Sequence, residues 1–366
     1  MKVAIVHDWL TGMRGGEVVL EALLDLFPEA DLFTLLHIPN CCSDKIEKRK
    51  IYTSFIQNFP FKEKLYRYYL PFFPTAIEEF DFWGYDLVFS SSHCVAKGVI
   101  VPPDVPHISY IHTPMRYVWD MYRTYFPGEN FLQKFLIPFF ANYLRTWDSA
   151  SAHRVDQYIA NSQFVARRIK KYYGRDAVVI HPPCIKNFPE LNLHQRDSFY
   201  LIVSALVPYK RVDIAVRAFR KLNQKLIIAG NGPELNKLKK LATPNIEFWV
   251  SPSKTEIAQL YQRAKALIFP GIEDFGIVPV EAQSYGCPVI AYRRGGALET
   301  VVENETGIFF DEQNENSLID AIKKFENFQF NEKTFRNHLM KFTYDNFIEK
   351  IKKIVFSFTN TNYTFS

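Results

Sequence analysis

The sequence predicts an α/β protein of two domains, each built on a parallel sheet with helices on both faces. Three observations support this prediction. Short apolar runs alternate with segments of helix length, which is typical of strands buried on both faces of a parallel sheet. The chain has 366 residues, enough for two domains of ordinary size. Near its middle, the proline-containing segment 181–198 has little periodicity and is suited to link two domains.

We expect apolar runs on both sides of this linker to form the strands of the two sheets. Those of the first half are Val3–Val6, Leu87–Ser90, Ile108–Ile111, Tyr158–Ala160 and Val178–Ile180. Those of the second half are Tyr200–Ala205, Leu226–Ala229, Ile246–Val250, Ala266–Phe269, Val289–Ala291 and Ile308–Phe310. With a boundary near residue 190, the N-terminal domain covers residues 1–190 and the C-terminal domain covers residues 191–340.

A last helix is expected over residues 341–358. Phe347, Ile351 and Val355 recur there at helical spacing and form one apolar face. The remaining tail, residues 359–366, is polar and is expected to be frayed.

The composition is that of a soluble globular protein, with 48% hydrophobic and 23% charged residues. No apolar run reaches the length of a membrane-spanning helix, and the N-terminal MKVAIVHDWL predicts a first strand, not a signal peptide. The five cysteines are odd in number and lack C-x-x-C spacing. This pattern favours incidental thiols in a cytosolic chain over a disulfide framework or a zinc site.

Basic and aromatic residues are interleaved over Lys45–Phe73, where seven basic residues and two acids accompany nine aromatic ones. Such a mixture suits an anionic membrane surface, because charge attracts the segment and rings settle at headgroup level. A nucleic-acid surface has a similar pattern. A solvated basic face backed by core aromatics would also produce it.

The most informative motif follows the run Ala266–Phe269, where Glu273 and Glu281 lie eight positions apart. Glu273 is on the loop at a strand's carboxyl end, and Pro279 is suited to begin the next helix, with Glu281 in its first turn. Backbone N–H groups at this helix start are unpaired donors at the positive end of the helix dipole, which suits a phosphate-bearing ligand. They belong to Gly276, Ile277 and Val278.

The segment EDFGIVPVEA, with the later Gly295–Thr300, resembles the E-x7-E signature of the retaining glycosyltransferases of family 4. The resemblance covers nearly the whole chain. It implies the GT-B architecture, two Rossmann-like domains whose parallel sheets face each other across a central cleft, with the C-terminal helix crossing back to the N-terminal domain. It also implies that Glu273 contacts the donor sugar, that Glu281 holds the ribose, and that Asp274 and Phe275 lie at the donor.

Glycines follow the first expected strand. Gly15 and Gly16 precede a helix that begins near Glu17, so their N–H groups can approach a phosphate or hydroxyl closely. A flexible turn would have the same sequence. The resemblance implies a glycine loop near the donor diphosphate and the acceptor, and Asp8 beside it is expected to orient an acceptor hydroxyl.

The third expected strand is followed by the segment HTPMRY. The resemblance implies a functional histidine near the donor sugar here, and we assign this role to His112. Its imidazole would bond a sugar hydroxyl, or its carbonyl oxygen would stabilise developing positive charge. Arg116 is expected at the acceptor. The histidines ranked below His112 are His7, His93 and His181.

Lys210 matches the lysine that neutralises the donor diphosphate in the family, where charge develops on the leaving group. Many family members have an arginine where this chain has Ala205. Arg211 or Arg116 is expected to take its place. Gly230, in the segment GNGP, resembles the family's G-D-G-P turn, at which the backbone passes close to the ligand.

The resemblance implies transfer of a hexose with retention of configuration and without a covalent nucleophile, with His112, Glu273 and Lys210 as the catalytic residues. No D-x-D cluster is present, so neither a metal nor another cofactor is expected. Segments such as YDLVFSSSH and LVPYKRVD resemble bacterial mannosyltransferases of O-antigen and surface-polysaccharide assembly. They imply GDP-mannose as donor and a polyprenyl-diphosphate-linked saccharide as acceptor.

We expect a cytoplasmic protein that is peripheral on the cytoplasmic face of the inner membrane, with no nucleic-acid partner. Four alternatives stay open at this point. A related transferase would use a UDP-sugar, a GT-B epimerase would consume donor without an acceptor, and a glycogen-type synthase would extend a soluble glucan. A catalytically silent protein would bind the sugar nucleotide as a scaffold of an assembly complex.

Overall fold

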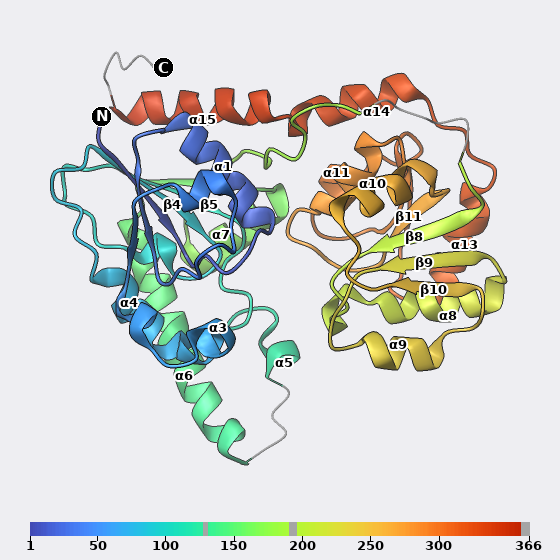
Figure 1. Ribbon diagram of the computed structural model, residues 1–366, viewed down its shortest axis with the longest axis horizontal. Coiled ribbons are helices and arrows are strands. Elements are labelled where there is room, and N and C mark those ends of the chain that lie inside the picture. The colour runs from blue at the N-terminus through green and yellow to red at the C-terminus, as the bar shows by residue number, and fades with distance from the viewer. Residues whose placement is uncertain (127–130, 190–195, 360–366) are drawn as a thin grey trace. The chain divides into compact units, whose positions relative to one another are not determined.

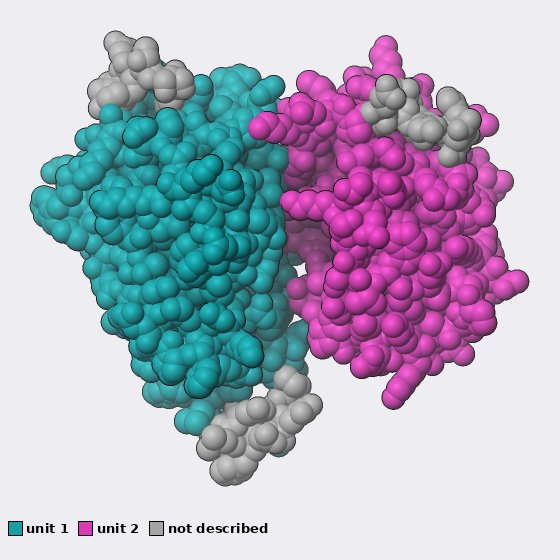
Figure 2. Space-filling view, in the orientation of Figure 1, with its two compact units in different colours: residues 1–183, 344–366 teal, residues 184–343 magenta. Residues whose placement is uncertain are grey.

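The computed structural model describes residues 1–126, 131–189 and 196–359 and divides into two compact units (Figures 1 and 2). The first unit combines Met1–Pro183 with Tyr344–Ser366, and the second is Cys184–Thr343. The division thus falls after Pro183, whereas the sequence placed it near residue 190. Of the expected tail, residues 360–366 lie outside the described residues.

Within the described residues, the first unit has a seven-stranded parallel sheet in the order β3-β2-β1-β4-β5-β6-β7. Its strands are β1 (Val3–His7), β2 (Asp31–Thr34), β3 (Ile51–Thr53), β4 (Leu87–Ser92), β5 (His107–Ile111), β6 (Gln157–Ala160) and β7 (Ala177–Val179). Its helices are α1 (Gly15–Leu26), α2 (Asp44–Glu47), α3 (Lys62–Leu65), α4 (Phe73–Glu78), α5 (Tyr122–Tyr125), α6 (Phe131–Ser151), α7 (Gln163–Tyr173) and α15 (Tyr344–Thr359). The strand order reverses between β1 and β4, where loops diverge and ligands of such sheets bind.

Both faces of this sheet are buried. Along β1, Val3 and Ile5 pack into one apolar cluster, while Ala4 and Val6 pack into another on the opposite face. The first cluster also includes the apolar stripe of α15, which runs beside α1 (Figure 1). The stripe consists of Phe347, Ile351 and Val355, all fully buried. The predicted apolar face of the last helix is therefore confirmed.

The second unit has a six-stranded parallel sheet among its described residues, in the order β10-β9-β8-β11-β12-β13. Its strands are β8 (Phe199–Val203), β9 (Lys225–Ala229), β10 (Ile246–Trp249), β11 (Ala266–Phe269), β12 (Val289–Tyr292) and β13 (Gly307–Phe310). Its helices are α8 (Val212–Leu222), α9 (Leu235–Leu241), α10 (Lys254–Arg263), α11 (Ile277–Ser284), α12 (Ala297–Thr300), α13 (Glu315–Phe325) and α14 (Glu332–Leu339). This is the strand order of a Rossmann fold, with its switch point between β8 and β11.

The predicted α/β class with two parallel sheets is confirmed, and every expected strand is present. The sequence did not predict β2 and β3. The expected run Val178–Ile180 is shifted by one residue relative to β7. No helix in the described part of the chain is both long and apolar enough to span a membrane.

Candidate functional site

A pocket of about 320 Å³ lies at the carboxyl ends of β8, β9 and β10 in the second unit. Because β8 adjoins the switch point of the sheet, this is the edge at which such folds bind ligands. The lining is mostly small or apolar, with hydroxyl and amide groups from three side chains. It consists of Val203, Ser204, Ala205, Ala229, Gly230, Asn231, Ser251, Pro252, Ile257 and Val278.

Two glycines of the GNGP turn allow the loop after β9 to approach the loop after β8. A Cβ on Gly230 would lie 1.9 Å from the carbonyl oxygen of Ser204, and its φ is +150°. A Cβ on Gly232 would lie 2.4 Å from the carbonyl oxygen of Leu206. Glycine is therefore required at these two positions mainly because the two protein loops lie in close contact there. Gly230 also lines the pocket, and its contact with a ligand stays a prediction.

Lys210 and Glu273 form an ion pair beside the same switch point. Lys210 follows β8 and Glu273 follows β11, and the ammonium group contacts Oε1 of the carboxylate. The carbonyl oxygen of Glu273 accepts a hydrogen bond of 2.8 Å from the Gly296 N–H. A Cβ on Gly295 would approach that carbonyl to 2.5 Å. The two glycines of the GGALET motif therefore hold the Glu273 loop in place.

Helix α11 begins at Ile277, after Gly276 with a φ of +95°. Its first N–H groups have no acceptor within the helix, and Val278 of this first turn lines the pocket. The predicted start at Pro279 is wrong, since Pro279 is the third residue of the helix. Glu281 consequently lies in the second turn, not in the first.

The Glu281 carboxylate is partly buried beside Tyr261. The Tyr261 hydroxyl donates a hydrogen bond of 3.3 Å to its Oε2. Burial raises the pKa of Glu281 above its ordinary value, and the tyrosine hydrogen bond opposes this shift. A carboxylate held in this way is oriented to accept a hydrogen bond from a ligand hydroxyl.

Three residues expected at the donor have other contacts. The Arg211 guanidinium binds Asp213 at 3.1 Å and Gln313 at 3.3 Å, so its charge is shared with a carboxylate of its own loop. The ring of Phe275 packs against Phe342 in an apolar cluster. The side chain of Asp274 is also buried. The contacts of Arg211 and Phe275 and the burial of Asp274 do not fit direct donor binding by the side chains and favour positioning of the loops.

In the first unit, Asp8 joins the two strands that flank the switch point. Its Oδ2 accepts hydrogen bonds from the N–H groups of His93 and Cys94, at 2.6 and 2.9 Å. Its Oδ1 accepts those of Val95 and Ala96, at 2.6 and 2.8 Å. The side chain is fully buried, so the expectation that Asp8 orients an acceptor hydroxyl does not fit this geometry.

A hydrogen-bonded group containing His112 lies at the ends of β1, β4 and β5. The Ser91 hydroxyl is 2.8 Å from Nε2 of His112 and 3.1 Å from Nδ1 of His7. The carbonyl oxygen of His112 accepts a hydrogen bond of 2.9 Å from the Asn161 amide. Gly16 lies against both rings, because a Cβ there would be 3.5 Å from His7 and 3.7 Å from His112. Gly15 and Gly16 are the first two residues of α1. The sequence prediction had placed them in a loop before this helix.

Burial, together with the neighbouring histidines, keeps the imidazole of His112 neutral. Desolvation lowers the pKa of His112 well below its ordinary value, and the neighbouring His93 and His7 lower it further. Burial raises the pKa of Glu17, but His7, at 3.7 Å, a backbone hydrogen bond and His93 all lower it, and together they bring the pKa to about 2. A neutral imidazole at physiological pH can exchange hydrogen bonds with hydroxyl groups.

Arg116 is half-buried on the loop between β5 and α5. Its charge acts on Arg168, which donates hydrogen bonds to Thr113 at 2.9 Å and to Asp120 at 2.7 Å. Burial lowers the pKa of Arg168, Asp120 opposes this shift, and Arg116 adds to it. Two cations thus lie close to the His112 segment, while the acceptor role of Arg116 stays a prediction.

The predicted residues therefore form two groups. The first unit brings Gly16 and His112 together. The second pairs Lys210 with Glu273 at the switch point, and Val278 at the start of α11 lines the pocket there. Sequence reasoning missed the members that depend on tertiary contacts. They are Ser91, Glu17 and Asn161 in the first unit, and Ser251, Ile257 and Tyr261 in the second. Of these residues, only Ser91 had a signal in the sequence, since it belongs to the run of serines before His93.

Two family models match adjoining parts of the chain. The model described as Glycosyltransferase Family 4 matches residues 13–185, and the model described as Glycosyl transferases group 1 matches residues 185–343. Their shared border is within two residues of the division between the structural units.

Curated relatives match over parts of their length. The alpha-1,3/1,6-mannosyltransferase ALG2 of Kluyveromyces lactis is 28% identical over 291 residues, 64% of this chain and 55% of that protein. The GDP-mannose-dependent alpha-(1-6)-phosphatidylinositol monomannoside mannosyltransferase of Mycobacterium tuberculosis is 33% identical over 138 residues, 33% of this chain and 36% of that protein. The chain thus spans about half the length of the curated relatives it matches, or less.

A solved structure agrees over nearly the whole chain. Anabaena HepE in complex with UDP-glucose aligns with a TM-score of 0.67 at 16% identity, covering 98% of this chain and 100% of that one. At this identity the agreement concerns the fold alone. Together with the two family models, it shows that the chain belongs to family 4 of the GT-B glycosyltransferases.

Proposed function

We propose that the chain transfers a hexose from a nucleoside-diphosphate sugar to an acceptor hydroxyl with retention of configuration. The observation that carries this proposal is the convergence at one switch point of a pocket, a helix N-terminus and the Lys210–Glu273 pair. The pocket and the pair share the loop after β8, and Val278 at the start of α11 lines the pocket. A nucleoside in the pocket would direct its diphosphate toward these donors.

The roles of the residues follow from their charges. The Lys210 ammonium and the α11 N–H groups would neutralise the diphosphate as it leaves. Once the ammonium turns to the diphosphate, the Glu273 carboxylate is released from its ion pair to accept hydrogen bonds from sugar hydroxyls. A leaving phosphate oxygen would take the proton of the attacking hydroxyl on the same face, so no covalent nucleophile is needed.

We further propose that the transfer step needs no metal ion. Lys210 and the helix N-terminus supply the positive charge that a divalent cation provides in other phosphate-leaving reactions. His112, held neutral beside Gly16, is proposed to bond a hydroxyl of the donor sugar.

The donor proposed here is GDP-mannose, and the acceptor a polyprenyl-diphosphate-linked saccharide of O-antigen or surface-polysaccharide assembly on the cytoplasmic face of a membrane. The names of the relatives support mannose, since both relatives described above are mannosyltransferases and one of them is GDP-mannose-dependent. A UDP-sugar is the second candidate, because the aligned HepE structure holds UDP-glucose. A silent sugar-nucleotide-binding scaffold is the third, because Ala205 stands where many family members have arginine.

Thermal stabilisation by GDP, UDP, GDP-mannose and UDP-glucose tests this proposal, because a ligand that binds only the folded state raises its Tm. We expect selective stabilisation by the two GDP ligands, worth about 2.7 kcal/mol at a hundredfold excess over Kd. The exposed Ala205 lines the pocket, so Ala205→Trp should fill the pocket and abolish the shift without lowering the Tm of the ligand-free chain.

The outcomes separate the candidates. A preference for UDP ligands would move the donor to a UDP-sugar. No shift with any of the four would contradict the nucleotide site. Binding without donor consumption, with or without lipid-linked acceptor, would favour the scaffold.

We also propose that Lys45–Phe73 contacts an anionic membrane. Part of this stretch is core, since Tyr66 and Phe73 are buried. Phe61 and Tyr68 are 77% and 79% exposed, and the exposed Lys64 lies on α3 between them. Exposed rings next to exposed cations support a membrane-facing surface over a purely solvated one. The mixture of buried and exposed aromatics explains why the sequence pattern was ambiguous.

Lys64→Ala/Arg67→Ala should lower partitioning onto anionic vesicles about tenfold or more, because each such cation contributes about 1 kcal/mol near the surface. Sedimentation with phosphatidylglycerol vesicles measures this, with phosphatidylcholine vesicles as the uncharged comparison. Lys239→Ala/Lys240→Ala, which removes two exposed lysines of the second unit, is the matched control. Equal losses in both variants, or no loss in the first, would reject this membrane surface.

A further inference from the structure

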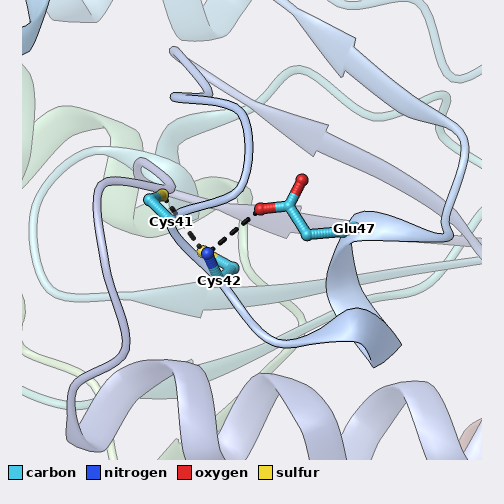
Figure 3. Close-up of side chains that lie close together, drawn as sticks. All are labelled: Cys41, Cys42 and Glu47. Atoms are coloured by element: carbon cyan, nitrogen blue, oxygen red, sulfur yellow. Dashed lines mark hydrogen bonds between the residues drawn. The ribbon is translucent and has the colours of Figure 1, made fainter.

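Two adjacent cysteines and an acid lie together at the end of β2, outside the groups described above. Cys41 and Cys42 are on the loop between β2 and α2, and Glu47 is the last residue of α2 (Figure 3). The two sulfurs are 3.5 Å apart. The sulfurs and a carboxylate oxygen of Glu47 all lie within 4.8 Å of one another. Three donor atoms of types that bind metals are thus gathered around one point.

His37 adds a fourth donor from the start of the same loop. Its Nε2 is 3.0 Å from Oε2 of Glu47, and the two side chains are 15% and 20% exposed. The other carboxylate oxygen, Oε1, accepts a hydrogen bond of 3.0 Å from the Cys42 N–H, which fixes the orientation of Glu47 (Figure 3). Two thiols, a carboxylate and an imidazole are all established zinc ligands.

The spacings suit a tetrahedral ion. With Zn–S bonds of about 2.3 Å, two sulfurs on one tetrahedral zinc lie about 3.8 Å apart. With Zn–N and Zn–O bonds of about 2.0 Å, the nitrogen and oxygen lie about 3.3 Å apart. The corresponding distances here, 3.5 Å for Cys41–Cys42 and 3.0 Å for His37–Glu47, differ from these by a few tenths of an ångström. Small side-chain rotations would therefore suffice for Cys41, Cys42 and Glu47. His37, which lies outside the set of atoms within 4.8 Å of one another, would have to turn toward the sulfurs.

Hydrogen bonds of the protein already hold the loop that carries these donors. The side-chain amide of Gln57 makes two hydrogen bonds with the His37 backbone. Its oxygen accepts from the His37 N–H at 2.9 Å, and its nitrogen donates to the His37 carbonyl at 3.1 Å. The carbonyl oxygen of Leu10 accepts from the Ile38 N–H at 2.9 Å and from the Cys41 thiol at 3.4 Å. The donors are thus brought together by a frame that does not depend on a metal, as binding sites for metals require.

We propose that His37, Cys41, Cys42 and Glu47 bind one zinc-class divalent cation as a closed structural site. Each thiol would release its proton to solvent when the cation binds. The bound ion would join the β2–α2 loop to α2, and the Ile38 N–H would keep the hydrogen bond to the Leu10 carbonyl when the Cys41 thiol loses its own. This site takes no part in the transfer step, and its occupancy is independent of the proposed function.

Zinc stoichiometry of the full-length chain tests the proposal. The protein is purified under reducing conditions, incubated with Zn²⁺ and freed of unbound metal, and bound zinc is measured by mass spectrometry. We expect one Zn²⁺ per chain in the wild type and its loss in Cys41→Ser/Cys42→Ser. Cys184→Ser, which removes a half-buried thiol outside the cluster, should keep the wild-type stoichiometry.

A milder variant guards against misfolding of the double serine variant. Glu47→Gln keeps an oxygen acceptor for the Cys42 N–H but loses the charge, so zinc affinity should fall tenfold or more. Addition of Zn²⁺ should raise the Tm of the wild type and leave that of Cys41→Ser/Cys42→Ser unchanged.

Two results would overturn the zinc site. One is a wild-type chain that binds no stoichiometric zinc, including the case in which its mass is lower by two hydrogen atoms because Cys41 and Cys42 have formed a disulfide. The other is equal zinc retention by the wild type and the double serine variant, which would place the metal elsewhere on the chain.

Discussion

Replacement of Glu273 by glutamine is expected to lower turnover by about a hundredfold or more while the chain stays folded, as when one preorganised polar contact is lost. Glutamine keeps the shape of the side chain and leaves the backbone contact with Gly296 intact. It loses the charge that pairs with Lys210, and its amide nitrogen cannot accept a hydrogen bond from a sugar hydroxyl. The loss should therefore appear in kcat together with kcat/KM, because the contact is proposed to strengthen as the glycosidic bond breaks.

Initial rates of donor consumption with the preferred nucleotide sugar measure the effect, and circular dichroism verifies folding. Glu305→Gln is the matched control, since Glu305 is an exposed acid of the same unit, and we expect its turnover to equal that of the wild type. Near-normal turnover of folded Glu273→Gln would remove Glu273 from the mechanism. A change in KM alone would limit its role to uniform donor binding.

The strands were predictable because burial on both faces leaves a continuous apolar signal. β1, β4 and β8 each lie between two other strands. β1 and β8 contain four or more consecutive apolar residues, and β4 has three apolar residues followed by three buried serines. β3 is different, because it is a three-residue edge strand whose residues are all half-buried. β2 has four residues and begins with an aspartate. Neither contains a run long enough to be told from a loop without its neighbours.

Local spacing correctly predicted that Glu273 lies on the loop after β11 and Glu281 in the helix that follows, although this helix begins two residues before Pro279. The candidate site was not predictable where the partner comes from elsewhere in the chain. Nothing near Arg211 indicated that Gln313 would bind it, and nothing near Phe275 indicated Phe342 as its neighbour. The same reason applies to the cysteine cluster, because adjacent cysteines do not match C-x-x-C spacing and depend on donors from a helix.

Replacement of Asp8 by alanine is expected to lower the free energy of unfolding of the first unit by about 3 kcal/mol or more. Four backbone N–H groups donate to this carboxylate, and each buried donor left without an acceptor costs about 1–3 kcal/mol before water relieves part of it. The His93 ring also loses a neighbouring carboxylate oxygen, Oδ2 of Asp8, which lies 3.1 Å from its Nδ1. The free energy of unfolding of Asp8→Asn should lie between those of the wild type and Asp8→Ala. Its amide oxygen can still accept hydrogen bonds, while its NH₂ group faces the remaining N–H donors and repels them.

Urea unfolding followed by tryptophan fluorescence measures this loss, because four of the five tryptophans lie in the first unit, at residues 9, 83, 119 and 147. Asp104→Ala is the control: Asp104 is an exposed acid of the same unit, and its removal should change stability by no more than about 0.5 kcal/mol. An Asp8→Ala chain as stable as this control would contradict the structural role and return Asp8 to the acceptor site. A large loss of stability would instead mean that Asp8 holds β1 to the loop after β4, and thereby sets the positions of His7, His93 and His112 relative to one another.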